Sequence, residues 1–252
     1  MHKGLFDNHV HIGTFEDTFY SYEDVFTVLK ISGVKGCIFS YFTPRFNNSF
    51  FAKDFFLASA NEIRKALVFA KSICFDAVPL LWIDPYMLLG SKDLFFYAKK
   101  LEFRGFKIHP YLHDWSNSVL LDAIFEYASQ NNKYVYIHTG QSTTDQPILF
   151  EHTISKYPNV KVHLAHCKEA KQVIYLMSKY ENVFGDTAFC PKEAFREIAN
   201  AGFRERMHFG TDFPVTHYYE NMNNPRQVSL SDLIGSYSRT IEQHEFDLCN
   251  SD

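Results

Sequence analysis

The stretch FDNHVHIG, residues 6–13, places His9 and His11 two positions apart after a short apolar lead-in. Its apolar and β-branched residues predict a β-strand that ends in polar side chains. Residues two apart on a strand point to the same face, so His9 and His11 share a face. Asp7 is expected on that face too, one layer deeper. The fold depends on how many strands of this kind follow.

Seven further short apolar or β-branched runs follow the first one. The predicted strands cover residues 5–11, 35–41, 77–84, 103–109, 133–139, 160–166, 182–189 and 207–212. Segments with helical spacing lie between them, as parallel strands require for their crossover connections. Eight such units in 252 residues predict an α/β fold, a single (β/α)8 TIM barrel formed by residues 1–252 as one domain. A doubly wound open sheet is the alternative, but no GxGxxG motif follows the first strand.

The helical segments have apolar residues at helical spacing. They cover residues 22–31, 61–72, 92–101, 119–130, 150–157, 168–180, 191–200 and 229–248. The segment 216–231, THYYENMNNPRQVSLS, is rich in Asn and polar residues. It is expected to be a loop that covers a site.

Composition and charge exclude several classes of protein. The net charge of −4 at pH 7 argues against a general nucleic-acid binder, which is usually basic. The five cysteines are scattered and form no CxxC pair, which is typical of reduced thiols in a cytoplasmic protein. No apolar run approaches transmembrane length, so no membrane partner is expected. The expected partner is a small-molecule substrate, and a homodimer is left open.

Histidine, lysine and aspartate side chains gather at the predicted carboxyl ends of the strands, where barrels of this type hold their active sites. They are His9 and His11 after the first strand, Lys107 and His109 after the fourth, His138 after the fifth, His166 after the sixth and Asp212 after the eighth. Each is costly to bury without a partner, and imidazole and carboxylate groups that converge predict a divalent metal site. His163, three residues before His166, is expected on the opposite face of its strand. Asp212 alone could instead cap a turn or a helix.

The phrases DNHVHIG, GFKIHP, YIHTG, HLAH and FGTDFP occur in this order between residue 6 and about residue 215. The ordered set resembles the amidohydrolase superfamily, and within it the amidohydrolase-related branch that includes amino-carboxymuconate-semialdehyde decarboxylase-like enzymes. The resemblance implies that one zinc or similar metal is bound by His9, His11, His138 and Asp212. It also implies that His166 lies beside the metal and polarises the substrate or assists proton transfer.

Lys107 leaves a second metal open. In two-metal relatives a carboxylated lysine after the fourth strand bridges the two ions, and Lys107 occupies that place here. Its other interpretation is an ordinary cation that pairs with Asp212 or with a substrate carboxylate. One metal is favoured.

The expected activity is metal-dependent hydrolysis of a small molecule, with Asp212 as general base and then acid. His166 and Lys107 complete the expected catalytic set, and the expected substrate contacts are His109, Arg45 and Trp82. Arg45 together with Lys107 would suit a carboxylated substrate. The alternative is a non-oxidative decarboxylase or hydratase that uses the same metal site. A non-catalytic metal- or ligand-binding barrel is a third reading, against which the intact Asp212 argues.

Overall fold

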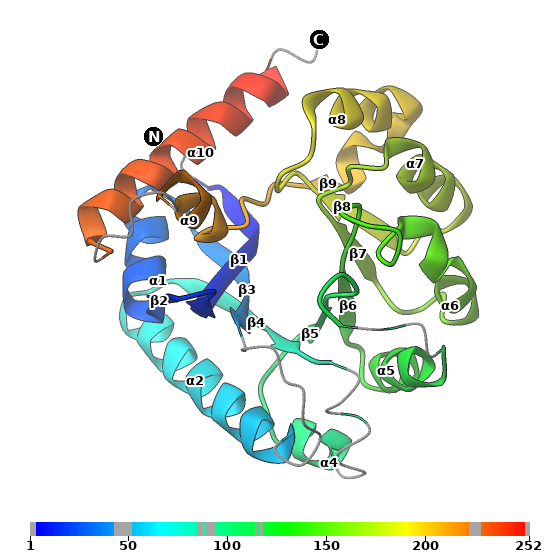
Figure 1. Cartoon of the computed structure of the whole chain (residues 1–252), viewed down its shortest axis with the longest axis horizontal. Coiled ribbons are helices and arrows are strands. Elements are labelled where there is room, and N and C mark those ends of the chain that lie inside the picture. The colour runs from blue at the N-terminus through cyan, green and yellow to red at the C-terminus, as the bar shows by residue number, and fades with distance from the viewer. Residues whose placement is uncertain are drawn as a thin grey trace.

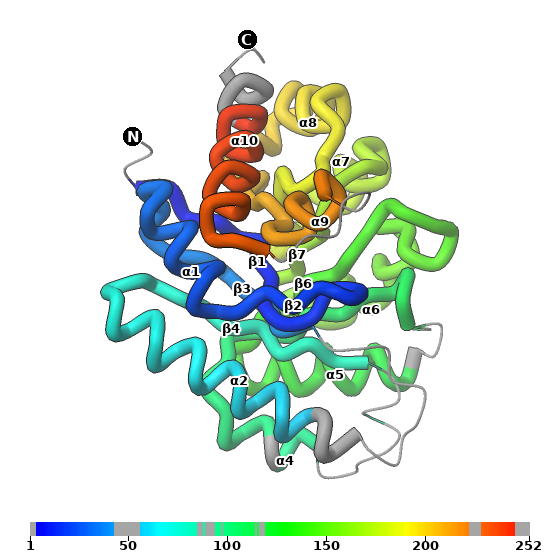
Figure 2. The backbone as a smooth tube through the Cα atoms, turned by 60° about the vertical axis from the view of Figure 1, so that its left-hand side comes forward, coloured from blue at the N-terminus to red at the C-terminus, as the bar shows by residue number. Residues whose placement is uncertain are grey.

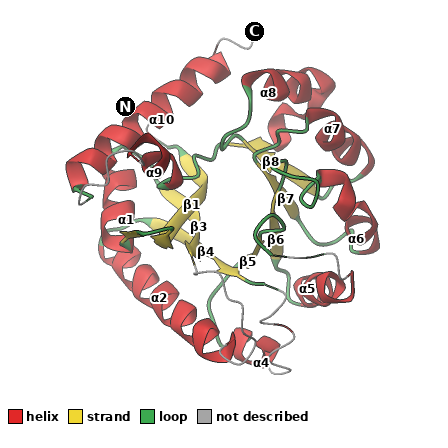
Figure 3. Ribbon diagram, viewed as in Figure 1, coloured by secondary structure: helices red, strands yellow, loops and turns green. Residues whose placement is uncertain are grey.

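A curled sheet of nine strands forms the inner wall of the molecule, and helices cover its outer side (Figure 1; Figure 3). The computed structural model describes residues 4–42, 52–84, 88, 94–113, 115, 118–221 and 228–249. Along the sheet the strand order is β2-β1-β3-β4-β5-β6-β7-β8-β9. Consecutive strands are therefore neighbours almost throughout, as strand–helix alternation predicts.

The strands are short, and eight of them run parallel. They are β1 Phe6–Phe15, β2 Thr18–Tyr20, β3 Gly36–Phe42, β4 Asp76–Trp82, β5 Gly105–Ile108, β6 Tyr134–His138, β7 Val162–Ala165, β8 Val183–Asp186 and β9 Met207–His208. Only β2 is antiparallel, pairing Tyr20 with Gly13 of β1. This small hairpin was not predicted from the sequence.

A helix follows each of the eight parallel strands along the chain. The helices are α1 Tyr22–Ile31, α2 Ala52–Ser72, α4 Leu94–Ala98, α5 Ser118–Gln130, α6 Glu151–Lys156, α7 Ala170–Lys179, α8 Lys192–Ile198, α9 Val215–Asn221 and α10 Leu230–Cys249. The last helix, α10, lies beside α1 (Figure 2). None of the helices in these ranges combines the length and the apolar character needed to cross a bilayer.

The segment after β9 runs along β1 and is tied to it by backbone hydrogen bonds. Asn8 N donates to Phe209 O and His11 N donates to Phe213 O, both at 2.8 Å. Between them, Asp212 N donates to His9 O at 2.8 Å. These bonds join β1 to the segment that follows β9 and set Asp212 beside the two histidines of β1.

Alternation along the strands divides the core into two parts. Phe39 of β3 packs into the large cluster between sheet and helices, whereas its neighbour Ile38 packs into a small inner cluster with Leu80, Tyr136 and Ala165. This is the period-2 pattern of a sheet covered on both faces. Burial of one such aliphatic or aromatic side chain contributes about 1.5–3 kcal/mol, so the wall that carries the site is rigidly held.

The prediction of a loop over residues 216–231 is wrong at its beginning. Residues up to Asn221 belong to α9, and those from Leu230 onward belong to α10. The Tyr-Tyr-Glu stretch of α9 packs near β1, where Tyr218 lies against Phe15 with ring centroids 4.9 Å apart. Tertiary packing of aromatic side chains overrides the weak local helix signal. Residues 222–227 lie outside the described part.

Candidate metal and catalytic site

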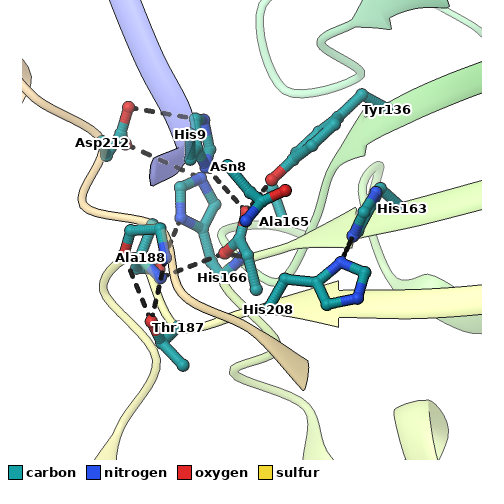
Figure 4. Close-up of polar contacts among 12 residues, drawn as sticks. Asn8, His9, Tyr136, His163, Ala165, His166, Thr187, Ala188, His208 and Asp212 are labelled. Atoms are coloured by element: carbon teal, nitrogen blue, oxygen red, sulfur yellow. Dashed lines mark hydrogen bonds and ion pairs between the residues drawn. The ribbon is translucent and has the colours of Figure 1, made fainter. Parts of the chain in front are cut away.

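The rings of His9 and His11 lie together in the middle of β1, with centroids 5.1 Å apart. Both rings are buried, and both approach one oxygen of Asp212. Figure 4 shows the His9 ring beside Asp212. Asp212 Oδ1 lies 3.0 Å from His11 Nε2 and 3.4 Å from His9 Nε2. The shared face expected from the HxH spacing is therefore present in the fold, and the segment that follows β9 supplies a carboxylate to it.

Asp7 does not lie beneath these rings, because β1 shifts register against β3 between Asp7 and Val10. Such an irregularity re-aims the side chains on one side of it. The Asp7 carboxylate instead accepts from the hydroxyls of Thr211 at 2.6 Å and Tyr237 at 2.9 Å. It also accepts from the backbone N–H groups of His9 and Thr211, both at 3.1 Å. Asp7 thus joins by hydrogen bonds the two segments that carry His9, His11 and Asp212. Burial raises the pKa of Asp7 to about 6.

Asp186 orients the His9 ring, a role that was not predicted from the sequence. His9 Nδ1 lies 2.8 Å from Asp186 Oδ2, which also accepts from the Tyr136 hydroxyl. Asp186 Oδ1 accepts from the backbone N–H of His166 at 2.9 Å and of Ala188 at 3.1 Å. A carboxylate on Nδ1 fixes the tautomer of a histidine and leaves Nε2 free to bind a cation. The signal in the sequence was the position of Asp186 at the end of the strand FGD, on the same edge as the other site residues.

His166 and His138 contact each other next to the His9 ring. His166 Nε2 lies 2.9 Å from His138 Nδ1, and the His9 and His166 ring centroids are 5.1 Å apart. His166 Nδ1 donates to Ala188 O at 2.9 Å, so Nε2 is the atom that faces the site. On its other nitrogen His138 contacts Gln141 Oε1 at 3.1 Å.

The prediction that His163 faces away from His166 is wrong. Strand β7 ends at Ala165, and His166 has a φ of 70°, so the alternation of a strand does not extend to it. His163 lies deeper on the same inner side, stacked on Tyr136 with ring centroids 4.8 Å apart (Figure 4). Its Nε2 contacts His208 Nδ1 at 2.8 Å.

Lys107 is fully buried at the centre of this group. Its Nζ lies 3.0 Å from His9 Nε2 and 4.7 Å from the centre of the Tyr136 ring. Burial lowers the pKa of Lys107 to about 8, and the opposing pull of Asp212 and Asp186 does not restore it. A lysine with this pKa is less completely protonated than usual, so a fraction of it is the neutral amine near physiological pH.

The remaining predicted substrate contacts lie at different depths. His109 stacks on His138 at 3.7 Å between centroids and on Trp82 at 5.4 Å, and it lines the site cavity. Trp82 is buried behind it, also against Phe42. Arg45 lies outside the described residues.

The predicted metal and catalytic residues all line one cavity of about 410 Å³, a size that suits a small molecule. They are His9, His11, Lys107, His138, His166 and Asp212, accompanied by Phe42, Tyr111, Lys168, Phe189 and Tyr219 among others. Burial alone would raise the pKa of Asp212, but the facing rings of His9, His11 and His166 outweigh it and leave the pKa below its usual range. Asp212 is therefore a carboxylate at neutral pH.

The side chains present fit a divalent cation. Donor atoms of His9, His11 and Asp212 lie within 4.8 Å of one another, and so do those of His9, His166 and Asp186. Asp212 Oδ1 is buried yet makes no well-directed hydrogen bond to a described residue, although two ring nitrogens lie near it. Two imidazole nitrogens and one carboxylate oxygen are a typical donor set for zinc or manganese. His138 belongs to neither group in this arrangement.

A family model described as amidohydrolase matches residues 58–228, more than half of the 252-residue chain. The chain therefore belongs to the amidohydrolase family, as its motifs indicated. The match contains His138, His166 and Asp212, whereas the HxH pair of β1 precedes it. No curated protein matches the chain.

Solved structures of low sequence identity share the fold. A probable 2-pyrone-4,6-dicarboxylic acid hydrolase from Acinetobacter baumannii, with citric acid bound, has a TM-score of 0.64 at 12% identity, over 97% of this chain and 95% of its own. A 5-carboxyvanillate decarboxylase from Novosphingobium aromaticivorans, with manganese and a nitrobenzoic acid, has a TM-score of 0.62 at 11% identity, over 92% of each chain. A 2,6-dihydroxybenzoate decarboxylase has a TM-score of 0.58 at 11% identity, over 96% and 99%. The likeness concerns the fold.

Proposed function

We propose that this chain is a metal-dependent hydrolase of a small, carboxylated molecule, built on a single (β/α)8 barrel. One observation carries the proposal. The Nε2 atoms of His9 and His11 face the same buried oxygen of Asp212, while their Nδ1 atoms are engaged behind them by Asp186 and Ser40. Rings that are oriented from behind and converge on a carboxylate are the arrangement by which proteins prepare a metal site.

His9, His11 and Asp212 would hold the ion, and His138 would join them by turning away from His166. The ion, when bound, supplies a Lewis acid that lowers the pKa of water and polarises an acyl oxygen. The backbone links between β1 and residues 209–213 support this assignment, because they fix Asp212 against both histidines. The same links support the closed barrel, since they join β1 to the segment that follows the last parallel strand.

Asp212 has a second oxygen for proton transfer. Oδ1 faces the histidines of β1, whereas Oδ2 lies 3.9 Å from His166 Nε2 on the cavity side. An ionised carboxylate there can accept the proton of the attacking water and deliver it to the leaving group. His166, whose Nδ1 donates to Ala188 O, presents an unprotonated Nε2 that can accept a proton on the other side. Lys107 and Lys168 supply the positive charge that suits a carboxylated substrate.

A lyase, which removes carbon dioxide from an aromatic acid or adds water, is the second candidate. The aromatic wall of the cavity, which includes Phe42, Tyr111 and Tyr219, favours a ring-containing acid. The same residues would hold the metal in that reaction. The aromatic wall is therefore the feature that favours the lyase over the hydrolase.

The test is a product analysis with the metal-loaded protein in ¹⁸O-labelled water. A panel of small lactones, amides and esters of carboxylic acids, together with hydroxybenzoic acids, is supplied with zinc or manganese. We expect metal-dependent turnover of a hydrolysable member with one ¹⁸O atom in the acid product. Release of carbon dioxide without incorporation of ¹⁸O would establish the lyase instead and contradict the hydrolase.

A further inference from the structure

A second cavity of about 550 Å³ lies beside the site, and the proposed function does not use it. It is formed by the segment after β8, by α8, by α9 and by α10, and its lining includes Phe189, Cys190, Phe195, Thr216, Tyr219 and His244. None of the metal-group residues lines it. Its volume lies within the range of small-molecule sites. Its lining combines aromatic and hydroxyl side chains with a few charged and polar ones, such as Lys192, Glu220 and Arg239.

One aromatic pair separates the two cavities. Phe189 and Tyr219 line both of them, and their ring centroids lie 6.2 Å apart in an edge-to-face arrangement. The Phe189 ring is in turn 6.1 Å from the ring of His166. Both separating side chains are exposed, Phe189 by 40% and Tyr219 by 51%. Two exposed rings, rather than tightly packed core side chains, thus separate the cavity of the candidate metal site from the second cavity.

The backbone of Phe189 is unusual for a bulky residue. Its φ is 50°, in the left-handed region that disfavours side chains with a Cβ. His166 and Asp212 share this feature, with φ values of 70° and 59°. Residues in this conformation cluster at functional sites, where the surrounding structure holds them in place. A phenylalanine held in this way projects its ring at the boundary between the cavities.

We infer that the substrate is elongated: its reacting end lies against His9, His11 and Asp212, and its apolar or aromatic remote end crosses the boundary formed by Phe189 and Tyr219 into the second cavity. The inference rests on the proposed function, because the metal site fixes the reacting end. The aromatic side chains of the lining, Phe189, Phe195 and Tyr219, suit an apolar group there. Arg239, the guanidinium of the lining, is already paired with Glu220 at 2.7 Å.

Two hydroxamic acids test this inference, because the hydroxamate group chelates a protein-bound metal and fixes one end of the probe. Acetohydroxamic acid has no tail, whereas 6-phenylhexanohydroxamic acid carries an apolar tail ending in a ring. Both are titrated calorimetrically into zinc-loaded and zinc-free protein. We expect the long probe to bind the zinc-loaded protein at least about 10-fold more tightly, because each buried methylene adds to the affinity.

Thr216 on α9 provides a matched pair of variants, because it lines only the second cavity and its hydroxyl has no hydrogen-bond partner among the described residues. Thr216→Trp fills the cavity and should abolish the advantage of the long probe, whereas Thr216→Val should keep it. Gln243→Trp, from α10, fills the same cavity and replaces Thr216→Trp if that variant fails to fold.

Three results contradict the account, and they differ. Equal affinity of the two probes for the wild type overturns the second cavity as a subsite while the metal site stands. If the long probe still binds more tightly in both tryptophan variants, the second cavity is likewise not a subsite. Failure of both probes to bind in a zinc-dependent way overturns the metal site, and the inference is lost with it.

Discussion

Asp212 is the residue on which the site depends most, because each of its two oxygens meets a different neighbour. Oδ1 faces the two rings of β1, and Oδ2 faces His166. Its position is fixed by backbone bonds on both sides, to His9 O and from Val215 N. The proposed metal ligand and the proposed proton carrier are therefore one side chain.

Replacement of Asp212 by asparagine separates these two tasks. An amide oxygen can still approach the ion, but it has no basicity, so Asp212→Asn should keep much of its metal. Turnover of a substrate identified in the ¹⁸O panel should fall about 10²–10⁴-fold, the usual contribution of general acid–base catalysis. Metal content, melting temperature and turnover are measured on one preparation. Near-normal turnover in a metal-loaded variant would remove the proton-transfer role from Asp212 and direct attention to His166.

At the scale of single residues, the sequence predicts the polar site residues that lie in strands or at their ends. It does not predict the residues whose side-chain positions depend on an unusual backbone conformation. His9, His11, Lys107 and His138 could be found because strand parity and strand ends are visible in the pattern. The left-handed conformations of His166, Phe189 and Asp212 are not visible, because no glycine marks them. The shared wall of the two cavities depends on one of these conformations and could not be predicted.

At the scale of elements, β6 and β8 support the ring that β1 presents. Tyr136 of β6 and the His9 ring both bond to Asp186 at the end of β8. Four donors therefore converge on one buried carboxylate, including the backbone N–H groups of His166 and Ala188. A lone aspartate at a strand end could not be recognised as their acceptor from the sequence, because the donors come from three other strands or loops.

Asp186→Asn should therefore weaken metal binding about 10–100-fold, the usual loss when an outer partner of a ligating histidine is removed. Tyr136→Phe is the matched variant, and a smaller loss is expected because His9 keeps its bond to Asp186. Metal affinity is measured by competition with a chromophoric chelator, with circular dichroism as the control for folding. An unchanged affinity in Asp186→Asn would show that the His9 ring is positioned without it.

At the scale of the whole molecule, buried neutral histidines make the fold sensitive to acid. Burial lowers the pKa of His163 to about 3, and burial likewise lowers the pKa of its partner His208. An unfolded histidine has a pKa of about 6.5. Between pH 6.5 and 3 the unfolded state binds the proton that His163 refuses, so stability falls as the pH falls, by about 1.4 kcal/mol per pH unit for one group.

His163→Phe should remove this part of the pH dependence while keeping the stack on Tyr136. The free energy of unfolding in urea is measured between pH 7 and 4.5 on metal-free protein. We expect the wild type to lose stability more steeply than the variant by about 1.4 kcal/mol per pH unit. Parallel curves for the two proteins would mean that the pKa of His163 is not lowered in the folded state.

The sequence predicts the alternation of strands and helices well, because parallel strands buried on both faces leave short but nearly continuous apolar runs. The helix of residues 22–31 appears with the predicted bounds as α1. The β1–β2 hairpin, the shift of register at Asp7 and the helix α9 were missed. Each of them depends on packing between segments far apart in the chain, as Tyr237 of α10 on Asp7 illustrates.

The central claim is that His9 and His11 hold a metal ion, and metal content measures it most directly. Wild type, His9→Ala, His11→Ala and the exposed-site control His152→Ala are purified, loaded with zinc and analysed by inductively coupled plasma mass spectrometry. We predict one ion per chain in the wild type and in His152→Ala, and a loss of the ion in both site variants with the fold intact. Full metal content in folded His9→Ala and His11→Ala would contradict the account.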